Sequence, residues 1–174
     1  MNQLVHNVIW PAVAGNVLWS FLQLAAAPNG DGAALHARLA SLLLVGVYLS
    51  IDWIDADSIL KELTWKYWVV DVGLAATISA FAIASQNANT WMRYPLALNF
   101  LLACAGHLCG AWDTASQPSS TRARWIFVAM NLAGLLILLL GSLTAGSFGA
   151  WSIPLSIAVV VLLYWLFRQR VLGR

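Results

Sequence analysis

The sequence predicts an all-α membrane protein with six transmembrane helices, short loops and both termini in the cytoplasm. Its 174 residues are 61% apolar and only 9% charged, and the mean hydropathy is +0.77. Soluble domains carry about 25% charged residues, so this chain has too few charges to cover a water-soluble globule. Intrinsic disorder is excluded because it requires low hydrophobicity and high net charge. The formal charge of +2 excludes nucleic-acid binding, which depends on dense clusters of Lys and Arg.

Six apolar stretches are long enough to cross the hydrocarbon core, which takes roughly 20 helical residues. In chain order these stretches are Leu4–Ala27, Ala33–Trp53, Trp65–Ser85, Trp91–Trp112, Trp125–Leu143 and Phe148–Phe167. Clusters of Gly, Pro, Asn, Gln or Ser predict turns at 28–32, 86–89 and 117–120 and around Gly146. Only Ile54–Thr64 reads as a longer, charged linker. Because no loop could hold a soluble domain, we expect a single transmembrane domain over residues 1–174.

Tryptophans support the ends of these stretches, because an indole at the membrane surface buries its ring and keeps its N–H in water. Six of them lie near a predicted end: Trp53, Trp65, Trp91, Trp112, Trp125 and Trp151. The first stretch has no basic segment before it, and its apolar part is longer than the roughly 7–15 residues of a signal peptide. We therefore expect it to be retained as a helix.

The basic residues predict the orientation, since Lys and Arg near span ends favour the cytoplasmic side. With six helices, one side holds Lys61, Lys66, Arg122, Arg124, Arg168, Arg170 and Arg174. The other side holds only Arg38 and Arg93, and we expect Arg38 to extend to water at the membrane surface. This bias predicts a multi-pass protein of the cytoplasmic (inner) cell membrane with both termini inside.

Polar residues on the first predicted helix form one continuous stripe. Inside a bilayer such residues are costly and usually face the bundle interior. Placed at 100° per residue, the stripe contains His6, Asn16, Ser20 and Gln23, with Trp19 on its edge. Two interpretations remain open. The stripe either packs against neighbouring helices through hydrogen bonds, or it forms the wall of a polar path or ligand site.

Asp71 is the most informative residue of the sequence. It lies about 9 Å from the Trp65 end of its span, and Tyr67 shares its face. An unpaired ionised carboxylate at this depth would cost at least about 2.5 kcal/mol. Asp71 must therefore be protonated, paired or in contact with water. Either it bonds Tyr67 or Lys66 and locks two helices together, or it handles a proton or cation.

The fourth stretch carries a second set of candidates. Asn99, Gly106 and Gly110 share a face, and the two glycines form a GxxxG motif that lets another helix approach closely. That helix could belong to the same chain or to a second copy in a homo-oligomer. His107 lies beside this face, and it could be a satisfied core histidine, a proton carrier or a ligand. With Asp71 it would form a proton-handling pair, because imidazole titrates near neutrality.

The sequence gives little support for a bound metal ion or cofactor. Cys104, His107 and Cys109 do not share a helix face, so we expect no metal site there. We expect no cofactor; a haem would need two histidines at matching depth, and His6 with His107 is the minor alternative. No P-loop, GxSxG or HExxH motif is present.

These observations favour a small transporter, channel or solute-binding subunit with a polar cavity. The expected cavity residues are Asn16, Trp19, Tyr67, Asp71, Asn99 and His107, with a secondary polar layer of His6, Asn7, Asp52 and Asn131. Trp19 would form an aromatic wall of the site for a small solute, and Asp71 would bind a proton or cation. The alternatives are an integral-membrane enzyme that acts on a lipophilic molecule with Asp71 and His107 as acid–base pair, and a structural or sensory subunit of a membrane complex.

Overall fold

The computed structural model describes residues 5–29, 32–59, 65–87, 90–113, 118–144 and 147–172, and within these ranges it contains helices and no strand. The elements are η1 (Val5–Ile9), α2 (Trp10–Ala26), α3 (Gly32–Ile59), α4 (Trp65–Ser85), η2 (Thr90–Met92), α5 (Arg93–Asp113), α6 (Pro118–Ser142) and α7 (Ser147–Leu172). Among the described residues, six helices are long and apolar enough to span a membrane, as the sequence predicts.

Three helices extend beyond their predicted ends, and one of them is α7, which continues five residues past Phe167 to Leu172. α3 continues to Ile59, so the first half of the expected charged linker is helical and that part of the prediction is wrong. Residues 54–59 contain neither Gly nor Pro to end a helix. α6 begins at Pro118, where a turn was expected. Proline is favourable at the first position of a helix, because the N–H it lacks would have no helical partner there.

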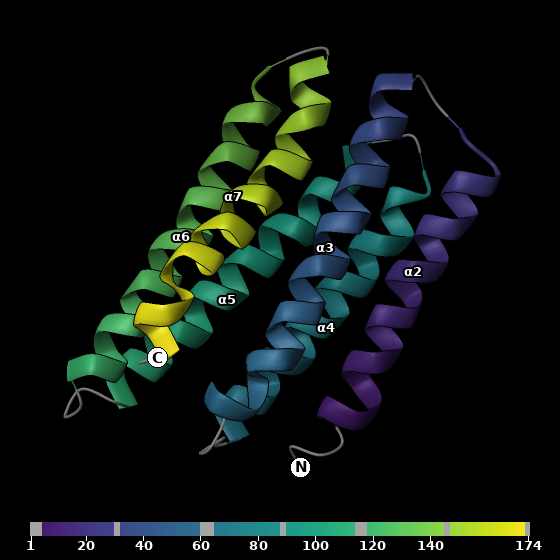
Figure 1. Cartoon of the computed structure of the whole chain (residues 1–174). Coiled ribbons are helices and arrows are strands. Elements are labelled where there is room, and N and C mark those ends of the chain that lie inside the picture. The colour runs from purple at the N-terminus through teal and green to yellow at the C-terminus, as the bar shows by residue number, and fades with distance from the viewer. Residues whose placement is uncertain are drawn as a thin grey trace.

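The six helices form a closed ring. Around it the order is α2, α3, α7, α6, α5 and α4, and α4 packs back against α2 (Figure 1). Both chain termini lie at the same end of the bundle (Figure 1). We call this end the terminal end. The opposite end, which holds the turns after α2, α4 and α6, is the loop end.

Apolar side chains fill the inside of the ring and also cover its outside. Leu42, Phe81 and Leu138 are at most 2% exposed in the core. On the outer surface Leu18, Leu136 and many other large apolar side chains are more than 40% exposed, which water would penalise and lipid does not. Together with the six apolar helices, this surface indicates a multi-pass membrane protein.

α6 and α7 approach each other most closely along a seam of small residues. A Cβ atom at Gly134 would lie 2.7 Å from Val160 Cγ2 and 3.2 Å from the carbonyl oxygen of Ser156. A Cβ atom at Gly141 would overlap the side chain of Ser152. Ser152 and Ser156 are fully buried, and each hydroxyl donates to a carbonyl of α7 at 2.7 Å. Because Gly134 and Gly141 have no side chain, Val160 and Ser152 of α7 pack directly against the backbone of α6.

Candidate functional site

A small cavity lies inside the ring and is lined mostly by apolar residues of α3, α4, α5, α6 and α7. Its volume is about 30 Å³. A cavity needs about 10–15 Å³ of this kind of volume to hold a water molecule, so the space fits one or two waters. Four lining residues are polar and come from four helices: Tyr48, Thr77, Asn99 and Asn131. The other lining residues are Val, Ile, Leu and Phe.

Hydrogen bonds fix how the two amides face this cavity. Asn99 Nδ2 donates to Thr77 Oγ1 at 2.8 Å and to the Leu74 carbonyl at 3.3 Å, and Thr77 Oγ1 donates to the same carbonyl at 2.9 Å. Asn131 Nδ2 donates to the Phe127 carbonyl at 2.9 Å. A carbonyl can only accept, so each amide must turn its nitrogen toward the backbone. The amide oxygens are then the atoms left to accept a hydrogen bond from a guest.

Asn99 and Asn131 were predicted as a cavity residue and as part of the secondary layer, and the structure places both at the cavity. Sequence reasoning missed Tyr48 and Thr77. Hydroxyl groups are common in spans because they bond to their own helix, as Thr77 does with Leu74, so neither residue stood out. The one available signal was position, since Tyr48 and Thr77 lie well inside their spans.

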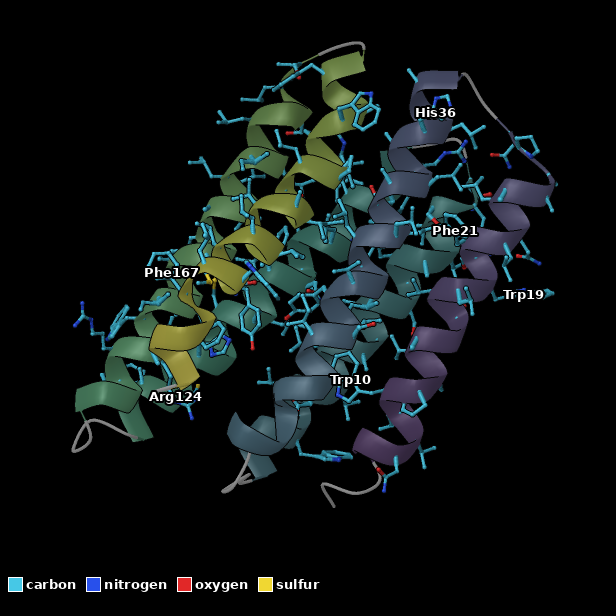
Figure 2. The ribbon with its side chains drawn as sticks, viewed as in Figure 1. Trp10, Trp19, Phe21, His36, Arg124 and Phe167 are labelled. Carbon is cyan, nitrogen blue, oxygen red and sulfur yellow. The ribbon has the colours of Figure 1, made fainter. Side chains whose placement is uncertain are left out.

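Two residues of the polar stripe of α2 form hydrogen bonds with α4 and the residue that follows it. This agrees with the interpretation that the stripe packs against a neighbouring helix. Asn16 Nδ2 donates to the Ser79 carbonyl at 3.4 Å, and fully buried Ser20 accepts from Gln86 Nε2 at 3.0 Å. Trp19 is 59% exposed and points away from the bundle (Figure 2). The structure places Asn16 and Trp19 outside this cavity, because none of its described lining residues belongs to α2. Asn7 is also exposed.

An aromatic stack lies on the terminal-end side of the cavity. The His107 ring stacks on Phe127 with centroids 4.5 Å apart and planes at 8°, and Phe127 contacts Tyr164 at 5.6 Å. Phe127 is one helical turn from Asn131 and Tyr164 one turn from Val160, both of which line the cavity. The stack therefore brings two titratable side chains close to the cavity.

Asp71 lies on α4 and is half-buried, outside the cavity lining. It precedes Ile78, a lining residue, by seven residues, so the two share a helix face and lie about 10 Å apart along the axis. The side chains of Tyr67, His6 and Asp52 lie outside the described part of the structure. The Tyr67–Asp71 contact, the haem alternative at His6 and the role of Asp52 therefore stay predictions.

The GxxxG motif contacts two helices of the same chain. A Cβ atom at Gly106 would lie 2.9 Å from Val70 Cγ1 of α4, and one at Gly110 would overlap the guanidinium of Arg124 on α6. Arg124 therefore lies across α5 near the terminal end (Figure 2). A homo-oligomer through Gly106 and Gly110 would require this packing to change.

At the loop end, Arg38 is an internal clamp. It is 3% exposed, so the expectation that it extends to water is wrong. Its Nη1 donates to Asn29 Oδ1 at 2.7 Å and to the Ser85 carbonyl at 3.1 Å, and its Nη2 donates to the Asn29 carbonyl. These bonds satisfy one carbonyl group in the turn after α2 and one at the end of α4, so the guanidinium is bound inside the protein and does not reach water. Arg93 similarly donates to the Gly149 carbonyl of α7.

Between the cavity and the loop end the interior is packed with apolar side chains. Leu42 lies one turn from Val45 on α3, Phe81 one turn from Thr77 on α4, and Leu138 two turns from Asn131 on α6, each on the loop-end side. We call Leu42, Phe81 and Leu138 the apolar plug. It separates the cavity from the Arg38 clamp.

Known proteins offer no guide to this arrangement: no protein-family model, curated protein or solved structure matches the chain. Within the described residues, no group of three His, Cys, Asp or Glu side chains could hold a metal ion. Interpretation of the cavity therefore depends on its own size, its polar groups and its surroundings.

Proposed function

We propose that this protein is a small transporter or channel whose substrate passes through the central cavity, with Asp71 as a proton- or cation-responsive group. The observation that carries the proposal is a cavity in the middle of the ring, where polar side chains from four helices meet among apolar ones. Protein interiors are close-packed, so voids that hold water are few. Intramembrane polar groups are costly and often mark substrate pathways.

The surroundings of the cavity support the same proposal. On the terminal-end side, His107, Tyr164 and Asp71 lie within about two helical turns of lining residues on their own helices. On the loop-end side, the apolar plug and the Arg38 clamp close the bundle. In this proposal the cavity of the described conformation is accessible from the terminal end. The basic residues predict that this end faces the cytoplasm at an inner membrane.

The decisive variant is Asp71→Asn, which keeps the shape of the side chain and removes its charge. Purified protein in liposomes is tested for passage of protons, rubidium ions and urea, with membrane potential and pH gradient applied in both directions. We expect at least one probe to cross faster than in empty liposomes, and at least tenfold more slowly in Asp71→Asn. The variant should insert and melt like the wild type.

Asp57→Asn is the matched control, because it removes a carboxylate from α3 beyond the membrane-spanning window Gly32–Ile51. Its fluxes should stay within twofold of the wild type. Equal fluxes in Asp71→Asn and wild type would contradict the proposed role of Asp71 as the proton- or cation-responsive group. Fluxes no greater than those of empty liposomes would contradict a transport function altogether.

A further inference from the structure

We infer that the species that crosses the cavity is the proton, relayed by one or two water molecules held between Tyr48, Asn99 and Asn131. The inference rests on the proposed transport function and narrows it to one substrate class. Three features of the site carry it: the volume of the cavity, the number and kind of its oxygen atoms, and the groups on its two sides.

The volume favours water over larger organic solutes and hydrated metal ions. The space of about 30 Å³ fits one or two water molecules. Hard divalent cations take about six oxygen ligands, so a hydrated ion brings several waters along. Such an ion would need a cavity several times larger. A proton needs no space beyond that of the water molecule that carries it.

The oxygen atoms are too few for a bare cation. Ion-selective filters replace the hydration shell with rings of backbone carbonyls or with carboxylates. This cavity offers the amide oxygens of Asn99 and Asn131 and the hydroxyls of Tyr48 and Thr77, and its described lining residues include no carboxylate. The Thr77 hydroxyl already accepts from Asn99 and donates to Leu74. A buried water needs only two to four polar partners, which this set supplies.

The terminal-end side carries groups that exchange protons. His107 and Tyr164 flank the Phe127 ring, one turn or more from the lining residues, and Asp71 lies two turns below Ile78 on the cavity face of α4. Imidazole and carboxyl groups both accept and release protons in proteins. Each relay step moves one proton along one hydrogen bond, and the water molecules stay in place.

The apolar plug lies across the second half of the proposed proton path, between the cavity and the loop end. Leu42, Phe81 and Leu138 lie on the loop-end side of the cavity, and the buried serines of that region, Ser41, Ser152 and Ser156, donate their hydroxyls to carbonyls of their own helices. Proton transfer to that side therefore requires the plug to move. This predicts slow, gated flux in the wild type, and faster flux when the plug is shortened.

Liposomes that enclose a pH-sensitive dye test the inference, with a potassium gradient and valinomycin to set the potential and to balance the charge of moving protons. We expect voltage-driven proton flux above that of empty liposomes, and no rubidium or urea flux. Asn99→Leu, which fills the cavity with an apolar side chain, should reduce proton flux at least tenfold. Phe81→Ala should raise it several-fold, a gain that misfolding does not explain.

A pair of threonine variants compares a cavity hydroxyl with an exposed one at the loop end. Thr77→Val and Thr144→Val each remove a hydroxyl that donates to a carbonyl three residues earlier, at 2.9 and 3.0 Å, but only Thr77 lines the cavity. We expect proton flux to fall at least fivefold in Thr77→Val and to stay within twofold in Thr144→Val.

The outcomes distinguish this inference from the proposed function. Rubidium or urea flux without proton flux would overturn the proton assignment and leave transport standing. No flux of any probe would overturn both. Proton flux that Asn99→Leu and Thr77→Val leave unchanged would show that protons cross elsewhere, and the assignment of the path would then be wrong.

Discussion

The seam between α6 and α7 makes a specific prediction about stability. In Gly141→Ala, the new methyl group would overlap Ser152 Cβ and Oγ, and the Cβ atom is held by the backbone of α7 and cannot rotate away. The two helices must therefore move apart. Overpacking of this kind costs about 1–3 kcal/mol. Alanine is the better helix former by about 1 kcal/mol, but Gly141 is the last residue but one of α6, where this gain is smaller.

The expected net loss is therefore about 1–2 kcal/mol of unfolding free energy. It is measured by titrating detergent-solubilised protein with denaturant and following tryptophan fluorescence. Gly46→Ala in α3 is the matched control, because nothing lies within 4 Å of its Cβ position. That variant should unfold at the wild-type denaturant concentration or slightly above it.

A second substitution tests the cause directly. Ser152→Gly removes both overlapped atoms and leaves Ser152 Cα at 3.5 Å from the new methyl group, which is ordinary van der Waals contact. The double variant Gly141→Ala/Ser152→Gly should therefore be more stable than the sum of the two single changes predicts. Additive losses, or a Gly141→Ala variant as stable as Gly46→Ala, would refute the close approach of α6 and α7.

Two further predictions concern the arginines. Arg38→Met should lower the unfolding free energy by about 1–3 kcal/mol, because it leaves the Ser85 and Asn29 carbonyls without their donor; a denaturant midpoint equal to that of the wild type would contradict the clamp. Gly110→Ala should cost less than about 1 kcal/mol, because the overlapped atoms are the end of the flexible Arg124 side chain and can move. The same titration checks it, and a loss as large as that of Gly141→Ala would count against this geometry.

The six spans were predictable because crossing a bilayer imposes a length and an apolar composition that few other structures need. The same reasoning could not place the ends of α3, α6 and α7. These helices continue past their apolar windows, through residues 54–59, 118–120 and 168–172, and hydropathy carries no signal there. Helix formation in those segments depends on the absence of Gly and Pro in the first and on Pro118 at the start of the second.

The candidate site was predictable only in part. Asn99 and Asn131 were identified by the cost of burying an amide in lipid. The role of Asn16 was open, because helix periodicity gives the direction of a side chain relative to its own helix and not the neighbour it meets. Arg38 was misplaced for a related reason: its bonds to Asn29 and Ser85 depend on the packing of α3 beside the ends of α2 and α4.

The contact between α3 and α7 has a consequence for biogenesis. Ribosomes deliver helices to the membrane in chain order, so α3 is inserted long before α7 can reach it. Until then Val45 and Tyr48 have no α7 beside them, and the wall formed by Ile157 and Val160 is missing. A nascent chain that stalls before α7 would lie in the bilayer as an open arc of five helices. Its cavity would lack the α7 wall and would be open to the lipid.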